Sequence, residues 1–239
     1  MTEAAQQLIN EKIFDLGVAA RRELNGDLHK LPLEGKCPPI RVVNPGGEHS
    51  IIAGVDADVD IQIDGHVGYF CGGMCRQANI IINGNAGQGV GSNMESGFIH
   101  VRGDASQSAG ATARGGLLLI DGNATSRCGI SLKGGDIVVK GSVGHLSAFM
   151  AQTGRLVVFG DAGDSLGDSI YEARLYVRGK VESLGADCIK KEMRDEHKKE
   201  LAELIAAAGE TGKVDVEEFS RYGSARKLYN FNVDNAGAY

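Results

Sequence analysis

Apolar residues and glycines recur along the middle of the chain with a period of 19 residues. Four and two positions before each repeating glycine, all seven copies carry isoleucine, leucine or valine. Two positions after the glycine, every copy carries alanine or valine. An apolar residue at every second position, rich in isoleucine and valine, indicates a β-strand with one buried face. The repeating glycines are Gly65, Gly84, Gly103, Gly122, Gly141, Gly160 and Gly179.

This period predicts a solenoid. Each unit contains one strand, a glycine corner and a short, glycine-rich return that cannot hold a crossover helix, which excludes Rossmann and TIM-barrel folds. We expect the glycine to permit a backbone bend that is closed to other residues. Because all units share one phase, each strand stacks on the same strand of the next unit. We predict an all-β solenoid, a right-handed parallel β-helix of seven 19-residue coils. The left-handed form is disfavoured because no hexapeptide period is present.

The flanking segments have helical patterns. Residues 3–24 carry an apolar stripe at helical spacing, with Gly26 as the expected stop. Residues 189–208 carry a second stripe that ends at Gly209. We expect these helices to cover the open ends of the solenoid.

Before the repeat, residues 31–59 predict irregular structure or short strands, with Gly46 keeping the 19-residue phase of a degenerate first coil. The chain therefore divides into three parts. These are an N-terminal helix and linker (1–37), the β-helix (38–188), and a C-terminal helix with a docking tail (189–239).

Composition narrows the function. Glycine accounts for 35 of 239 residues and proline for 4, which suits many tight bends rather than a flexible linker. The net charge of −6 argues against a nucleic-acid-binding face. We find no signal-peptide pattern and no apolar run of the ~20 residues that a membrane span needs. Five cysteines, an odd number, indicate reduced thiols and a cytoplasmic location.

Motifs of catalytic or cofactor-binding type are weak. The Gly87, Gly89 and Gly91 sequence looks like a phosphate loop, but a strand rather than a helix follows, so we interpret these as coil glycines. Cys71 and Cys75 lack the spacing of zinc or iron–sulfur ligands and are interpreted as buried small residues. The six histidines fall at unrelated phases. We predict no catalytic, cofactor-binding or metal-binding residue in this chain.

Two surface features remain. Eleven positions after each repeat glycine stands a residue with a long or polar side chain, which indicates either a solvated edge with pairing between coils or a docking surface for an acidic partner. The residues are Arg76, Glu95, Arg114, Lys133, Gln152, Tyr171 and Lys190.

The tail combines aromatic and basic residues, the chemistry of buried interfaces. It either packs on its own solenoid or docks a partner. The docking candidates are Phe219, Arg221, Tyr222, Arg226, Tyr229 and Phe231.

The repeat, the three glycines at 87–91 and the glycine corners resemble the C-terminal β-helix (GxGxG) domain of the glutamate synthase large subunit, over about residues 38–188. With its helical tail and the ending GSARKLYNF (223–231), the chain resembles the stand-alone β-helix subunit of N-methylglutamate synthase. The repeat alone is also similar to a subunit of formylmethanofuran dehydrogenase.

The resemblance implies a complex with a class II amidotransferase-like subunit and an FMN-binding glutamate-synthase-like subunit. It makes this chain a scaffold without catalytic residues, and places FMN, and any iron–sulfur cluster, in the synthase partner. Two alternatives stay open. One is the β-helix subunit of another complex, such as formylmethanofuran dehydrogenase, or a general interaction module. The other is a carbohydrate-active β-helix enzyme, which the absence of stacked acidic residues disfavours.

The period itself makes a prediction. Deleting residues 85–103, one whole unit, should leave a shorter soluble solenoid, because all later positions keep their phase. Deleting only residues 85–93 should abolish folding, because inward positions then turn outward. Circular dichroism and size-exclusion chromatography compare the two proteins, and identical behaviour would contradict the solenoid.

Overall fold

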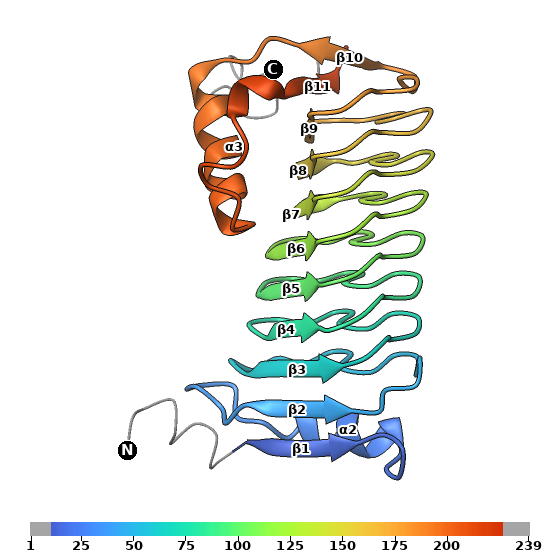
Figure 1. The fold of residues 1–239 in the computed structure, drawn as a ribbon, viewed down its shortest axis with the longest axis vertical. Coiled ribbons are helices and arrows are strands. Elements are labelled where there is room, and N and C mark those ends of the chain that lie inside the picture. The colour runs from blue at the N-terminus through green and yellow to red at the C-terminus, as the bar shows by residue number, and fades with distance from the viewer. Residues whose placement is uncertain (1–10, 227–239) are drawn as a thin grey trace.

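The computed structural model describes residues 11–226 and shows a parallel β-helix of about seven turns, as predicted. One strand of each coil lies above that of the previous coil, so that the strands form a single sheet along the long axis (Figure 1). The stacked parallel strands are β2 (Ile40–Val43), β3 (Asp60–Asp64), β4 (Asn79–Ile82), β5 (Phe98–Val101), β6 (Leu117–Ile120), β7 (Lys133–Val139), β8 (Thr153–Val158) and β9 (Arg174–Val177).

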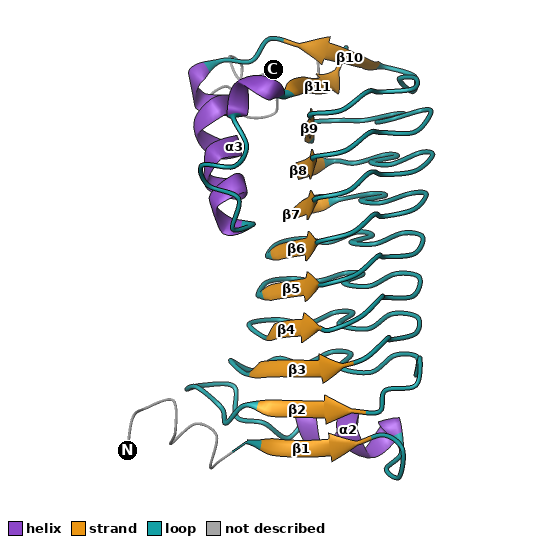
Figure 2. Ribbon diagram, in the orientation of Figure 1, coloured by secondary structure: helices purple, strands orange, loops and turns teal. Residues whose placement is uncertain are grey.

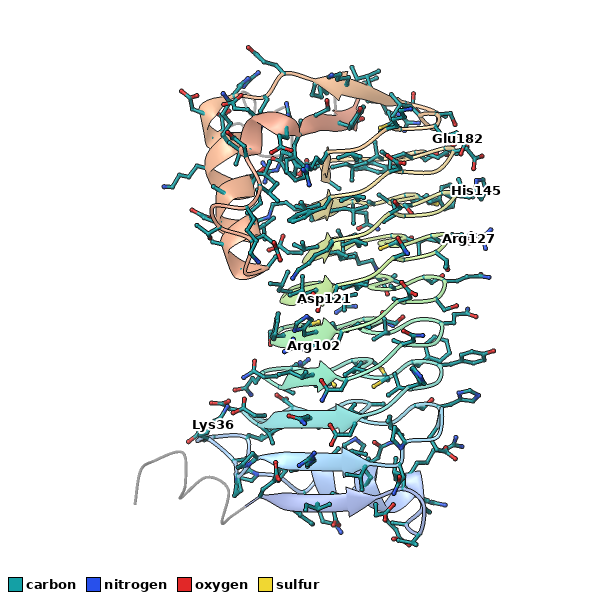
Figure 3. All side chains as sticks on the ribbon, in the orientation of Figure 1. Lys36, Arg102, Asp121, Arg127, His145 and Glu182 are labelled. Carbon is teal, nitrogen blue, oxygen red and sulfur yellow. The ribbon has the colours of Figure 1, made fainter. Side chains whose placement is uncertain are left out.

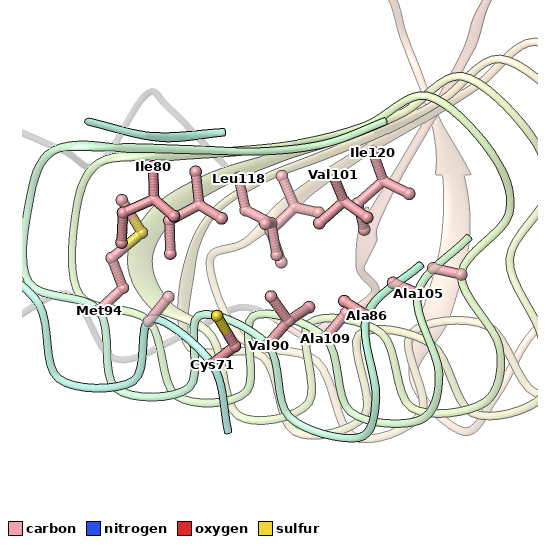
Figure 4. Packing of buried hydrophobic residues seen from close by; sticks show 14 of the residues in the cluster. Cys71, Ile80, Ala86, Val90, Met94, Val101, Ala105, Ala109, Leu118 and Ile120 are labelled. Atoms are coloured by element: carbon pink, nitrogen blue, oxygen red, sulfur yellow. The ribbon is translucent and has the colours of Figure 1, made fainter. Parts of the chain in front are cut away.

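The strands pair in the register that the 19-residue period predicts. Ile82 lies opposite Val101, and Val101 lies opposite Ile120, so these side chains form one continuous internal column. All three are fully buried. Figure 4 shows Val101 and Ile120 above the return segment, whose Ala86 and Ala105 close the core from below. The core of the molecule is therefore the inside of the solenoid itself.

The small apolar residues after each corner form a second ladder. Val67, Ala86 and Ala105 are joined by single parallel bridges, and the series continues to Val181. Beyond this ladder the return segment places residues five, seven and nine positions after the repeat glycine at positive φ, as in Gly89 and Gly91. These backbone bends reverse the chain within a few residues without a helix.

The corner glycines are required for a different reason from the one we expected. Of the seven, only Gly65 has a positive φ, of 139°. The others lie too close to the previous coil. A Cβ on Gly84 would stand 2.6 Å from the carbonyl carbon of Gly65, and one on Gly122 would stand 2.3 Å from Asp104 Oδ1. The space that a side chain would need is thus filled by the coil below.

The N-terminal prediction is wrong for residues 12–15. They form strand β1 (Lys12–Asp15), which pairs in parallel with β2 and buries Phe14, because an unpaired sheet edge offers them hydrogen bonds. The helix starts later, as α2 (Arg21–Leu28). It continues through Gly26, the expected stop, and ends at Leu28, whose side chain is buried. Residues 3–10 of the predicted helix lie outside the described residues.

The first coil also departs from the period. Strand β2 pairs with β3 at an offset of 21 residues, with Arg41 opposite Gln62. By that register the partner of Gly65 is Asn44, so Gly46 does not occupy the corner position that we assigned to it. The two extra residues are accommodated in the irregular segment before β3.

The C-terminal end closes the sheet with antiparallel strands. Residues 188–191 form β10 (Cys188–Lys191) rather than the start of the predicted helix, because β11 (Ser220–Ser224) returns and pairs with them. Strand β11 lies between β9 and β10 and is antiparallel to both. The helix itself is α3 (Asp195–Ala207), and it ends as predicted at Gly209, whose φ is +74°. A short 3-10 helix (Val216–Glu218) precedes β11.

Helix α3 covers the outer face of the upper sheet (Figure 2). Three positions before the repeat glycine, strands β6, β7 and β8 carry apolar outward side chains. These residues, Leu119, Val138 and Val157, pack against Leu201 and its neighbours on α3, and are almost fully buried. Phe219 joins this second core through an edge contact with Phe159, with ring centres 5.6 Å apart.

The corner packing generates a stability prediction. Gly122→Ala should lower the free energy of unfolding by about 1–3 kcal/mol, because the new methyl group overlaps Asp104 and the Gly103 backbone. Gly26→Ala is the matched control: nothing lies within 4 Å of its Cβ position, and alanine favours a helix by roughly 1 kcal/mol over glycine. Urea unfolding measures both, and a Gly122→Ala protein as stable as wild type would contradict the contact.

Candidate interaction surfaces

The thiols are part of the core. All five cysteines are free and buried, as interpreted for Cys71 and Cys75. Burial raises the pKa of Cys75 to about 11 and that of Cys128 to about 12, so these side chains stay protonated at neutral pH. Within residues 11–226, no group of three or more histidine, cysteine or acidic residues is placed to hold a metal ion.

The glycines at 87–91 are coil glycines, as interpreted. A Cβ on Gly87 would lie 2.6 Å from the carbonyl carbon of Gly68 in the coil below. Gly89 and Gly91 have φ values of 73° and 66° in the return segment. The backbone of this loop stacks on its neighbour, and the strand β5 follows it. These three glycines therefore allow the close stacking of coils and the backbone bends of the return segment.

A polar ladder that we did not anticipate runs up the glycine corner. The side chain that follows each repeat glycine accepts a hydrogen bond from the equivalent backbone N–H of the next coil, as in Asp104 N–H to Asn85 Oδ1, at an N···O distance of 3.0 Å. Six such bonds are continuous from His66 to Lys180. The signal was visible in the sequence as the run His66, Asn85, Asp104, Asn123, Ser142 and Asp161.

The ladder eleven positions after the glycine is partly paired between coils. Arg76 Nη2 lies 2.6 Å from Glu95 Oε2, and Arg114 Nη1 lies 3.9 Å from Glu95 Oε1. Arg76 also faces Asp56, at 3.4 Å. Both arginines remain half exposed, so these pairs add little stability. Lys133 is exposed and forms no ion pair with any described residue.

The structure separates the six docking candidates of the tail. Phe219, Arg221 and Tyr222 are more than nine-tenths buried against their own solenoid. This favours the alternative in which the tail packs on its own chain. Arg226 remains at the surface, where it forms an ion pair with Asp187. Tyr229 and Phe231 lie outside the described residues, and their docking role stays a prediction.

A buried polar cluster fixes α3 to the sheet. The Tyr176 hydroxyl donates to Glu200 on α3, and Arg174 Nε lies 3.1 Å from the same carboxylate. Burial, followed by Glu200, raises the pKa of Tyr176. Beside them Arg221 Nε donates to the Glu192 carbonyl oxygen over 2.8 Å. Burial, followed by the charge of Arg221, lowers the pKa of His197, whose Nδ1 accepts the Arg194 N–H at the start of α3.

This cluster generates a pH prediction. Because the folded pKa of His197 is lowered, the unfolded chain binds more protons below the usual histidine pKa of about 6.5. The contribution of His197 to stability is complete above that pH and is lost as the pH falls toward the lowered value. His197→Gln should flatten the decline of the melting temperature between pH 7 and 5. His145→Gln is the control. That side chain is half exposed and lies 2.8 Å from the Asp164 carboxylate, so its loss should not flatten the decline, and equal slopes in the two variants would contradict the prediction.

Within residues 11–226, no helix combines the length and the apolar character that a membrane crossing requires. No protein-family model matches the chain.

Among proteins of known sequence, the chain is 57% identical over 227 residues to Protein GlxC of Rhizobium meliloti (strain 1021). The match covers 95% of this chain and 99% of that protein, so it extends well beyond the repeat into both flanking segments. Similarity at this level over nearly the whole length shows common descent and a common fold. The chain is therefore a member of the GlxC family.

Proposed function

We propose that this chain is a structural subunit of an FMN-dependent complex related to glutamate synthase, specifically an N-methylglutamate synthase. In this proposal the complex converts methylamine and glutamate to N-methylglutamate and ammonia. The chain orients a class II amidotransferase-like subunit and an FMN-binding synthase subunit, and the flavin belongs to the latter.

The observation that carries the proposal is that the side chains of the solenoid hold its own coils together. The interior is closed by apolar residues along its length. The corner side chains and many surface charges are engaged between coils, as in the Asn85 ladder and the Arg76–Glu95 pair. Each coil contacts only its neighbours through contacts that repeat, so the chain forms a regular rod. An extended body of this kind suits the spacing and orientation of other subunits.

Two further features support it. The resemblance to the β-helix of glutamate synthase rests on the corner glycines and on Gly87, Gly89 and Gly91, and the structure accounts for these residues by coil stacking. A Cβ on Gly87 would meet the backbone of Gly68, so coil stacking accounts for this glycine. In the proposal, the flavin is held by the synthase partner.

The proposal is tested by isolating the chain from its own cells with an affinity tag. Native mass spectrometry should find it with two larger chains, and the complex should release FMN. The same preparation should form N-methylglutamate from methylamine and glutamate, whereas the isolated chain should not.

Two outcomes would contradict the proposal. One is a chain that is found only by itself under all conditions of growth. The other is copurification with the subunits of a tungsten or molybdenum enzyme, which would assign the chain to a complex of the formylmethanofuran dehydrogenase type.

A further inference from the structure

One edge of the solenoid carries large side chains that stay exposed in the fold. Ten positions after the repeat glycine, every coil from Gly65 to Gly160 places a side chain inside the core. The flanking positions, nine and eleven, therefore point outward along the same edge. We call this the return edge. Its large apolar and basic side chains are Met74, Arg76, Arg114, Lys133, Met150 and Tyr171, and its one acidic residue, Glu95, lies between Arg76 and Arg114. Helix α3 lies on the strand face, where it packs on Leu119 and Val138, and leaves the return edge open.

The methionines of this edge are placed at a cost to the fold. Met74 has a φ of 58° and Met150 a φ of 54°, in the left-handed region that is less favourable for an L-residue than the right-handed one. Their side chains are 59% and 46% exposed, so burial within the chain does not offset that cost. The equivalent residues of the other coils are polar and shorter, namely Asn93, Thr112, Ser131 and Ser169.

The charges between the two methionines are not balanced within the chain. Arg76 is neutralised by Glu95 and Asp56, but Arg114 shares the same Glu95 only at 3.9 Å. Lys133 follows one coil later, about 4.8 Å along the axis, and has no carboxylate partner among the described residues. Two stacked cations repel one another, which is notable in a chain of net charge −6. This part of the edge attracts carboxylates.

A shallow hollow of about 490 Å³ lies at the upper end of the edge. Met150 and Tyr171 line it, together with Gln152, Thr153 and Glu172. Met150 and Tyr171 provide the large apolar surfaces of this lining, and Glu172 is its one charged residue. From Met74 to Met150 the edge spans four coils, about 19 Å. The return edge is therefore apolar at its two ends, at Met74 and Met150, and basic between them, at Arg114 and Lys133.

We propose that the return edge is the docking surface for an acidic segment of a partner protein chain. The carboxylates of that segment face Arg114 and Lys133, and its apolar side chains contact Met74 at one end and the Met150–Tyr171 hollow at the other. The inference rests on the proposed function, because it requires that the chain works within a complex. Figure 3 shows the side chains of the described residues along the whole solenoid.

The first test changes the two stacked cations, Arg114 and Lys133. Arg114→Glu together with Lys133→Glu should reduce the apparent affinity for the copurifying subunits at least about tenfold, because attraction becomes repulsion. Arg22→Glu with Lys199→Glu is the matched control. It makes the same change of charge at exposed positions that form no ion pair with a described residue, and it should alter the affinity less than about twofold. Thermal melting should be nearly equal for both variants, since all four side chains are exposed.

The second test identifies the contact directly. Zero-length carbodiimide crosslinking of the intact complex should join the Lys133 amine to an aspartate or glutamate of a partner subunit, and peptide mass spectrometry should locate the bond. Met150→Asp, which leaves Lys133 in place, should weaken both the complex and this crosslink.

The outcomes separate the two proposals. A wild-type chain that copurifies with no subunit overturns the proposed function and the docking surface together. A complex that survives in the Arg114/Lys133 variant as well as in the control overturns the docking surface alone. So does a variant that loses only self-association, because the edge would then join two copies of this chain.

Discussion

The structure depends on the close stacking of equivalent positions in consecutive coils. The corner glycine has no side chain because the coil below occupies its place, with Asp104 Oδ1 only 2.3 Å from where the Gly122 Cβ would stand. The same oxygen accepts the N–H of Asn123, over 2.7 Å. A single contact thus excludes a side chain at one position and requires an acceptor at the next. The period follows from it, because a coil of another length would misplace both groups.

The ends show what happens where this stacking stops. At the N-terminal end the offset widens to 21 residues between β2 and β3, and β1 adds one more strand below them. At the C-terminal end Lys180 occupies the ladder position, and lysine has no acceptor to offer a further coil. Strand β11 then pairs in the opposite direction and ends the parallel stack. The sheet is finished by strands that cannot continue the repeat.

The strand face and the return edge of the solenoid differ in how far they are covered. Helix α3 covers the strand face and is held there by the Glu200 cluster. Phe219 of the tail packs in the apolar cluster beneath α3, and Arg221 is buried as well. The return edge keeps Met74, Met150 and the stacked cations exposed. The docking that we propose therefore needs no rearrangement of this chain, because its own fold is completed on the strand face and the proposed partner contacts the return edge.

The sequence by itself determined the coil architecture, since a 19-residue period in apolar and glycine residues has one consistent stacking. It also determined the inward columns, the buried cysteines and the end of α3 at Gly209. It did not reveal why the corner glycines are needed, because their constraint is a contact between residues 19 apart and not a local φ. That contact could have been inferred only from the polar residue after each glycine.

Only the tertiary structure decided the flanking segments and the tail. Residues 12–15 have an apolar stripe that suits a helix, yet the free edge of β2 offers backbone hydrogen bonds that they take as a strand. Phe219, Arg221 and Tyr222 have the composition of an interface, and whether that interface lies within the chain or with a partner depends on where β11 returns. Local pattern specifies what a segment can bury. The surface that it is buried against is set by residues far away in the sequence.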